Sequence, residues 1–259
     1  MATAPADGSA DKTMMIDFHT HILPGVDDGA RSEEESIAML RRQRRSGVDR
    51  ICLTPHFYPG HQTLEGFLDQ RTEAWERLCR SMEGESFPEL RLGAEVHYSP
   101  DILQMDLRQL TLGDTDYLLL ELPHGRYPAY IVQVIQKMME EGLTPILAHV
   151  ERFPYFRKDP SLLKRLIDLG ALGQVSADSI HLKLDKGFAK ACLGCGLAQL
   201  VGSDAHNMED RRPCMEEVTK LPEPMIRQIE TFSQCLWENE VPPMVRTTLP
   251  KKNFFGKYS

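Results

Sequence analysis

The segment Asp17-Phe18-His19-Thr20-His21 ends an apolar run that starts at Met14, near the beginning of the chain. In an extended strand, residues i and i+2 lie on the same face, so the two imidazoles are expected to point the same way. A His-x-His pair by itself is more often structural than metal-binding. Its meaning here depends on which other residues the fold brings to the same place.

Six further short apolar runs follow the first, and stretches with helical spacing of apolar residues lie between them. Seven strands that alternate with helices predict a parallel sheet with covered faces. One closed or nearly closed barrel fits a chain of 259 residues better than two domains do. We therefore predict a single-domain α/β barrel. Its strands are expected at Met14–Ile22, Arg50–Thr54, Leu90–Glu95, Tyr117–Leu122, Thr144–His149, Leu172–Ser176 and Gln199–Ser203.

Local signals mark the ends of several predicted helices. Ser32 precedes three glutamates and starts a capping box for a helix over Glu33–Gly47. The last helix is predicted over Glu223–Glu240. Two more caps, each placed before a proline, are Ser99 and Asp159. The glycines expected to end helices in a left-handed conformation are Gly47, Gly142 and Gly170.

The composition narrows the class of function. The chain has 30 Lys and Arg against 38 Asp and Glu, a formal net charge of −8, which argues against a nucleic-acid binder with a broad basic surface. No apolar run is long enough to span a membrane. Residues 1–13 are predicted to be a disordered tail without signal-peptide features, residues 14–245 the folded domain, and residues 246–259 a loose basic tail. We expect a cytoplasmic protein.

The six cysteines are expected to be free thiols. A cysteine-based phosphatase holds its thiolate in a C-x5-R phosphate loop, and none of the six is followed by an arginine six positions later. Catalysis by a cysteine nucleophile is therefore not expected.

Side chains that can bind metal fall at the ends of the predicted strands, where the loops of a parallel barrel form the active site. Besides His19 and His21, these are His56, Glu95, Glu121, His149, Asp204 and His206, with Asp28 in the loop after the first strand. So many carboxylates at one rim would repel each other without cations between them. Imidazoles and carboxylates without thiolates suit Mn, Fe or Zn. The other histidines, predicted to have surface or packing roles, are His61, His97, His124 and His181, of which His97 and His124 lie near the rim.

These residues resemble the PHP (polymerase and histidinol phosphatase) superfamily, and most closely its bacterial capsule-type branch of metal-dependent protein-tyrosine phosphatases. The resemblance runs from Met15 to about Arg212 and rests on the stretches IDFHTHILPGVDDG, TPH, GAEVHYSPDIL, AHVERF and SDAHNMEDRRP. It implies a distorted barrel of seven βα units with up to three divalent metals, Mn²⁺ first and Fe, Co or Zn as alternatives. It also implies a phosphotyrosine protein as substrate, namely a bacterial tyrosine autokinase of capsule or exopolysaccharide production.

The resemblance further implies how the residues divide. One metal would be held by His19, His21, Glu95 and Asp204. Glu95 would bridge to a second metal, also held by Glu121 and His149, and the third would be held by Asp28, His56 and His206. Arg152 and Arg211 match the branch's phosphate-contacting arginines. Small-molecule phosphatases of the superfamily commonly have His at the positions of Asp28 and Glu121, so the carboxylates there favour the tyrosine-phosphatase branch and Mn.

The expected reaction is direct attack of a metal-bridging hydroxide on phosphotyrosine, without a phospho-enzyme. Phe57 and Tyr58, which follow His56, could flank the phenyl ring or form an exposed aromatic pair. The loop after His56 and the chain after Arg212 depart from the branch's pattern, which bears on the identity of the protein substrate. Two other functions stay open: a small-molecule phosphatase of the histidinol-phosphate type, and a non-catalytic PHP domain that binds or regulates a partner.

Overall fold

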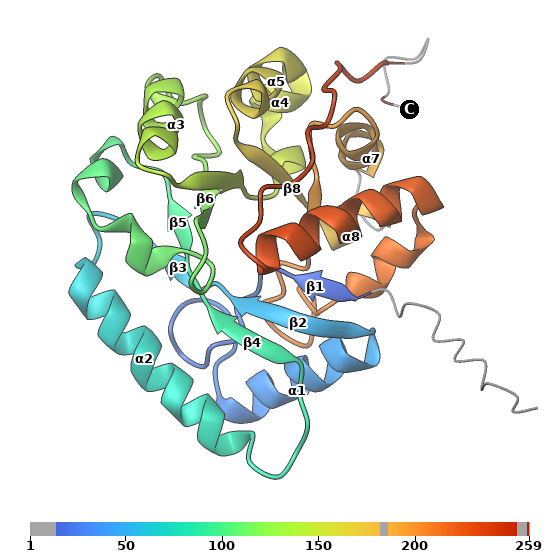
Figure 1. Cartoon of the computed structure of the whole chain (residues 1–259). Coiled ribbons are helices and arrows are strands. Elements are labelled where there is room, and N and C mark those ends of the chain that lie inside the picture. Colours follow the sequence, from blue (N-terminus) through green and yellow to red (C-terminus); the bar gives the residue numbers. More distant parts are fainter. Residues whose placement is uncertain (1–13, 182–185, 253–257, 259) are drawn as a thin grey trace, which may run out of the picture.

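The computed structural model describes residues 14–181, 186–252 and 258. The predicted N-terminal tail at residues 1–13 lies outside the described residues, as do residues 253–257 and 259 of the predicted C-terminal tail. In the described part, a ring of strands is surrounded by helices (Figure 1).

All neighbouring strands of the described chain pair in parallel. They form one sheet in the order β1-β2-β4 and a second in the order β3-β5-β6-β7-β8-β9. The largest difference from the predicted bounds is in the first strand, which ends at Asp17 and not at Ile22. The strands are β1 Met15–Asp17, β2 Val48–Leu53, β3 His56–Phe57, β4 Glu89–Leu92, β5 Glu95–His97, β6 Tyr117–Glu121, β7 Thr144–Leu147, β8 Leu172–Ser176 and β9 Leu200–Gly202.

The second and third strands of the barrel are each broken in two. β2 pairs with β4 up to Leu53 and Leu92, and β3 pairs with β5 from His56 and Glu95, so the register is the same on both sides of the break. The Glu95 N–H donates to the Pro55 carbonyl at 3.0 Å and bridges the interruption. Pro55 has no N–H to give to a ladder, which is why proline occurs where strands are interrupted. The two sheets are therefore seven strands of one barrel, as predicted.

The barrel closes between its first and last strands. Past the ends of β1 and β9, Thr20 forms a parallel bridge with Ala205. The Asp204 N–H donates to the His19 carbonyl at 2.8 Å, and the His21 N–H to the Ala205 carbonyl at 2.9 Å. The two segments that carry the predicted metal ligands thus leave the regular ladder but remain side by side.

Eight α-helices in the described chain surround the strands: α1 Glu33–Arg45, α2 Leu64–Ser81, α3 Ile131–Glu140, α4 Pro154–Lys158, α5 Pro160–Asp168, α6 Ala177–His181, α7 Lys186–Gly194 and α8 Glu223–Trp237. Two predicted caps are confirmed, since the Ser32 Oγ accepts from the Glu35 N–H at 3.3 Å and Asp159 accepts from the Ser161 N–H at 3.1 Å. The predicted helix-ending glycines Gly47, Gly142 and Gly170 have φ values of 85°, 76° and 112°.

The barrel is distorted between β5 and β6. There the chain makes two short 3₁₀ helices, Pro100–Gln104 and Leu107–Leu110, in place of a full α-helix. Ser99, predicted to cap a helix, caps the first of them by accepting from the Asp101 N–H at 3.3 Å. Two other 3₁₀ helices lie at Val150–Arg152 and Met215–Lys220.

Helix α8 covers one end of the barrel, and Figure 1 looks onto it. Its residues Phe232, Leu236 and Trp237 join one buried cluster with interior strand residues. The Tyr117 hydroxyl donates to the Glu240 carbonyl just after α8 at 2.7 Å. Because Tyr117 begins β6, this apolar cover lies at the amino ends of the strands. The carboxyl ends are left to carry polar groups.

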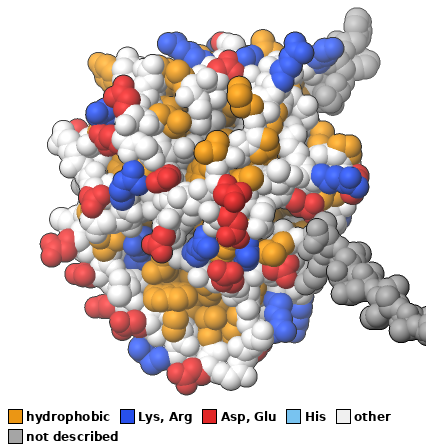
Figure 2. Space-filling view, viewed as in Figure 1, with side chains coloured by type: hydrophobic (Ala, Val, Ile, Leu, Met, Phe, Trp, Pro, Cys, Tyr) orange, Lys and Arg blue, Asp and Glu red, His pale blue; other side chains and the backbone are white. Residues whose placement is uncertain are grey.

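The face seen in Figure 2 carries acidic and basic side chains next to each other, without a broad basic area. Within the described residues, no helix is both long and apolar enough to cross a membrane. The described part of the predicted C-terminal tail contacts the barrel: the Thr248 N–H donates to the Cys195 carbonyl at 2.9 Å, and the Tyr258 hydroxyl donates to the Arg157 carbonyl at 2.6 Å.

Candidate metal centre

The nine predicted metal ligands converge at the carboxyl ends of the strands. The ring centroids of His21 and His206 lie 3.8 Å apart, those of His21 and His56 4.5 Å, and those of His19 and His149 5.7 Å. Two of the ligands, His149 and Asp204, have left-handed backbones with φ values of 33° and 51°. Non-glycine residues seldom adopt this conformation, and it occurs most often at functional sites.

Four of these residues form a group at the centre of the barrel mouth: His19, His21, Glu95 and Asp204. The His19 Nε2 lies 3.1 Å from the Glu95 Oε2 and 3.4 Å from the Asp204 Oδ1. The His21 Nε2 lies 3.3 Å from each of the same two oxygens. All four side chains are almost completely buried. This is the ligand set expected for the first metal.

Glu95 also reaches the second expected group. Its Oε1 lies 3.0 Å from the His149 Nε2, which is in turn 3.6 Å from the Glu121 Oε1. The His56 Nδ1 lies 3.0 Å from the Glu95 Oε2, so Glu95 is shared by imidazoles from three strand ends. A carboxylate with one oxygen towards each of two ligand groups is placed to bridge two cations.

The third expected group stands at the outer edge of the cluster. The Asp28 Oδ1 lies 3.4 Å from the His206 Nε2 and 3.6 Å from the His56 Nε2. Asp28 is the most solvent-exposed member, with 64% of its side chain accessible, whereas His206 is buried. His21 also belongs to this group by distance.

Buried polar atoms without a hydrogen-bond partner test whether these residues fit metal ions. Among the described residues, three atoms that face the cluster, the His56 Nδ1, Glu95 Oε2 and His206 Nε2, are buried and have no such partner. An unsatisfied buried polar atom costs free energy, so native structures seldom leave several in one place. Lone pairs of imidazole and carboxylate that converge without donors are what a divalent cation requires. The donor set therefore fits metal ions.

Neighbouring side chains orient the imidazoles that are predicted to bind metal. The His21 Nδ1 lies 2.6 Å from the Asp27 Oδ2, which also accepts from the His56 N–H at 2.9 Å. The Gln174 Oε1 lies 3.2 Å from the His19 Nδ1 and accepts from the His149 N–H at 2.9 Å. Contacts of this kind place the proton on Nδ1 and leave Nε2 free for a metal.

The charges of the cluster hold its groups in shifted protonation states. Burial lowers the pKa of His19, but the carboxylates of Glu95 and Asp204 outweigh it and raise that pKa. Burial raises the pKa of Glu95, yet the imidazoles of His19 and His56 bring it well below its ordinary value. The shifts differ across the cluster, since burial lowers the pKa of His56 and of His206. Metal ligands must be deprotonated, so metal affinity is expected to fall as the pH falls.

Both predicted arginines contact Asp204 from the solvent side. Arg152 donates through Nη1 to the Asp204 Oδ2. Arg211 donates through Nη2 to the Asp204 Oδ2 at 2.9 Å, and its Nη1 lies 3.6 Å from the Asp28 Oδ2. Burial lowers the pKa of Arg152, but the Asp204 carboxylate outweighs it and the net shift is upward, so the guanidinium stays charged. Two guanidiniums therefore border the ligand groups.

Of the two aromatic residues after His56, Phe57 points into the core and Tyr58 is partly exposed. Phe57 is fully buried and packs against Phe67, with ring centroids 5.1 Å apart and the rings tilted by 48°. Full burial disagrees with both predicted roles of Phe57, a contact with the substrate ring and an exposed pair with Tyr58, because neighbouring side chains of a strand point to opposite faces. Tyr58 is 36% exposed, and its ring centroid lies 5.0 Å from that of His56 and 5.4 Å from that of His97.

A family model described as capsular polysaccharide synthesis, CpsB/CapC, matches residues 15–240. This chain belongs to the CpsB/CapC family. Tyrosine-protein phosphatase YwqE of Bacillus subtilis (strain 168) is 36% identical over 207 residues, which cover 76% of this chain and 79% of the relative. Tyrosine-protein phosphatase CpsB of Streptococcus pneumoniae is 31% identical over 221 residues, covering 78% and 87%. The resemblance to the capsule-type branch is confirmed.

The fold of this CpsB/CapC member agrees with a crystal structure from work on YwqE of Bacillus subtilis and CpsB of Streptococcus pneumoniae, described as unique metal-dependent tyrosine phosphatases. The TM-score is 0.81 at 28% identity, over 92% of this chain and 100% of that chain.

Three residues that contact the ligands were not predicted as part of the site. His97, predicted to pack or lie at the surface, is 3.0 Å from the Glu121 Oε2 through its Nδ1. Asp27 is next to the predicted ligand Asp28 in the sequence. Only the contacts of the two side chains in the structure show that their roles differ. Gln174 is the one amide in strand β8, whose other residues are apolar or small. This contrast is the only feature of the sequence from which its role could have been predicted.

Replacing Asp27 by Ala is expected to weaken metal binding about 10–100-fold, the usual effect of removing a group that orients a metal-bound imidazole. The change removes the acceptor of the His21 Nδ1 and of the His56 N–H together. Calorimetric titration of the metal-free protein with Mn²⁺ measures the effect. Asp114→Ala, at an exposed position, is the matched control. Equal affinity in the Asp27 variant and the parent would contradict the orienting role.

Proposed function

We propose that this chain is a metal-dependent protein-tyrosine phosphatase that uses no cysteine nucleophile. The observation that carries the proposal is the arrangement around Asp204, where the ligand groups for several divalent cations meet two arginines. In this arrangement the cations and the arginines contact the phosphate group of a phosphate monoester. The alcohol part of the monoester, here the tyrosine ring, points away from them.

The divalent metals are proposed to be Mn²⁺ ions, up to three in number, with Fe, Co or Zn as alternatives. The ligands are His19, His21, Asp28, His56, Glu95, Glu121, His149, Asp204 and His206. Bound metals supply Lewis acidity that activates water near neutral pH and offsets phosphate charge. The donor set of imidazole and carboxylate, with no thiolate, supports this choice.

The arginines are proposed to hold the phosphate. Arg211 has 36% of its side chain exposed and Arg152 has 20%, so both can present N–H donors to a ligand at the mouth of the site. Guanidinium pairs match the equatorial oxygens of a phosphoryl group, and their charge is worth more where water is excluded. Asp204 fixes the direction of both guanidiniums from behind.

Tyr58 is proposed to contact the ring of the substrate tyrosine. Tyr58 is 36% exposed and lies beside His56 and His97. The leaving tyrosine has a conjugate-acid pKa near 10, so it needs little proton donation. A general acid is therefore not required.

The cysteines give no competing nucleophile. All six are free thiols. Burial raises the pKa of Cys214 to about 12 and raises that of Cys192 well above its ordinary value, so both stay protonated near neutral pH.

The protein substrate is proposed to be a bacterial tyrosine autokinase of capsule or exopolysaccharide production, and the proposed location is the cytoplasm. Support for the process comes from the family, whose description names capsular polysaccharide synthesis. Support for the reaction comes from the relatives, which are named tyrosine-protein phosphatases.

The proposal is tested by assaying the purified chain on a phosphotyrosine peptide with added Mn²⁺, with and without a chelator, beside histidinol phosphate. Phosphate release from the peptide is expected, with loss on chelation and recovery when the metal is restored. Activity that survives complete chelation would refute the metal dependence. A strong preference for histidinol phosphate would refute the protein substrate.

A further inference from the structure

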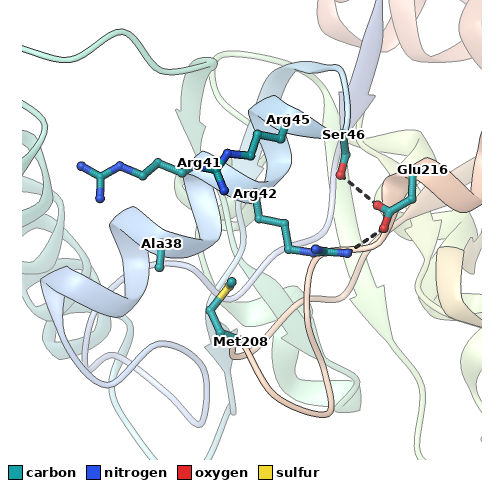
Figure 3. A pocket seen from close by; sticks show the side chains of 7 residues that line it. All are labelled: Ala38, Arg41, Arg42, Arg45, Ser46, Met208 and Glu216. Atoms are coloured by element: carbon teal, nitrogen blue, oxygen red, sulfur yellow. Dashed lines mark hydrogen bonds and ion pairs between the residues drawn. The ribbon is translucent and has the colours of Figure 1, made fainter.

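A groove lies between α1 and the chain that follows β9. It encloses about 440 Å³ and is lined by Ala38, Arg41, Arg42, Arg45, Ser46, Met208 and Glu216. Figure 3 shows the three arginines on α1 with their side chains fanned out: Arg42 reaches towards Glu216, Arg41 extends in the opposite direction, and Met208 lies on the facing loop. We propose that this groove binds an acidic segment of the protein substrate while the phosphotyrosine lies in the metal centre. The inference rests on the function proposed above.

Arg42 holds the two walls of the groove together, and Arg41 and Arg45 are the arginines that can bind an acidic ligand. Arg42 donates to the Pro213 carbonyl at 2.6 Å and to the Glu216 carboxylate at 2.7 Å, which ties α1 to the opposite wall. Arg41 donates through Nε to both Glu85 oxygens at 3.1 Å and through Nη2 to Oε2 at 2.7 Å, with 50% of its side chain exposed. A ligand that uses Arg41 must therefore compete with Glu85, and the solvent exposure of the pair lowers the cost of that exchange. Arg45 is exposed and makes no hydrogen bond or ion pair with any described residue.

A short loop connects the groove to the metal centre. The His206 N–H donates to the Arg211 carbonyl at 2.8 Å, and the Arg211 N–H donates to the Asn207 Oδ1 at 3.1 Å, so the loop between the two residues is tightly closed. Met208 lies within this loop, is 39% exposed and lines the groove. Met208 therefore belongs both to the loop that carries Arg211 and to the wall of the groove.

The net charge of the whole chain is opposite in sign to that of the three groove arginines. The formal net charge is −8, so an acidic substrate is repelled by the average surface. Arg42, Arg44 and Arg45 lie in the last turn of α1, where basic side chains stabilise the helix end. This preference does not account for Arg41, which lies before that turn. Guanidinium groups bind carboxylates in forked geometry, and Met208 offers an adaptable apolar contact for the connecting peptide.

The test compares peptides of equal length with one central phosphotyrosine. The first carries glutamates on its N-terminal side, the second carries them on its C-terminal side, and the third has glutamine at all these positions. One glutamate peptide is expected to have a KM about 3–10-fold below that of the glutamine peptide, with the difference reduced in high salt. Equal KM values for all three peptides would overturn the proposal.

Double charge-reversal variants test whether the preference for glutamate peptides comes from the groove. The variant Arg41→Glu with Arg45→Glu is expected to lose the preference for glutamate. The control, Lys137→Glu with Arg227→Glu, makes the same charge change on α3 and α8 and is expected to keep it. The readout is the ratio of kcat/KM for the glutamate and glutamine peptides within each variant, which cancels general damage to the site. Loss of preference in the control, or its survival in the groove variant, would contradict the proposal.

Failure of the groove and failure of the phosphatase function give different results. If no phosphotyrosine peptide is hydrolysed, the proposed function is wrong. Fluorescence anisotropy with labelled copies of the same peptides then still tests the groove, since binding needs no turnover. Tighter binding of the glutamate peptide to the parent than to the groove variant would support the inference, and equal binding would refute it.

Discussion

The Glu95→Gln variant is expected to lose phosphatase activity, by about 10³-fold or more in kcat. The Glu95 Oε2 lies 3.1 Å from the His19 Nε2 and 3.0 Å from the His56 Nδ1, and its Oε1 lies 3.0 Å from the His149 Nε2. Glutamine keeps the shape but replaces an anion that faces both ligand groups with a neutral group that carries N–H donors. Loss of several kcal/mol of transition-state stabilisation from displaced metals corresponds to a factor of this size.

The measurements for this variant are kcat on a phosphotyrosine peptide and the metal content of the purified protein. Both are expected to fall together. Glu89→Gln on β4 is the matched control, because 56% of that side chain is exposed and it lies outside the metal-capable groups. A Glu95→Gln protein with full metal content and near-parental kcat would show that Glu95 is not a shared ligand.

The Arg211→Ala variant is expected to lower kcat/KM for phosphotyrosine about 10²–10³-fold, the usual effect of removing one charge-stabilising donor. The Arg211 Nη2 lies 2.9 Å from the Asp204 Oδ2, and its Nη1 faces Asp28 at 3.6 Å, so the guanidinium spans two ligand groups at the mouth of the site. Arg152 still contacts Asp204 in the variant, so the ligand itself stays in place.

Metal content separates this effect from damage to the centre and is expected to stay near the parental value. The adjacent Arg212→Ala change is the control, because Arg212 is exposed and makes no ion pair with any described residue. If the Arg211 and Arg212 variants behaved alike, Arg211 would have no special role towards the phosphate.

The metal centre could be predicted from the sequence because parallel strands bring their carboxyl ends to one rim. His56, Glu95, Glu121 and His149 are far apart in the chain, yet each stands at the end of an apolar run, and the strand alternation alone places them together. The Asp28 and Glu121 carboxylates then narrowed the family through the resemblance. The helix ends at Ser32 and Gly47 were also readable, since capping depends on neighbours along the chain.

Other features depend on contacts between distant parts of the chain. The break in the second strand follows from Pro55, but only the pairing of His56 with Glu95 shows that the register continues. The direction of Phe57 towards Phe67 decides that it belongs to the core. Both features depend on how side chains pack in the folded protein, and the spacing of residues along the sequence does not specify that packing.

The sequence by itself determined the barrel, its seven strands and the residues that meet at its mouth, because hydrophobic period and strand ends are local properties. Only the tertiary structure decided which groups orient those residues. Asp27 and not its neighbour Asp28 holds His21, and Gln174 connects His19 with His149 from another strand. Such partners are chosen by direction and distance across the barrel, so no spacing along the chain can distinguish them.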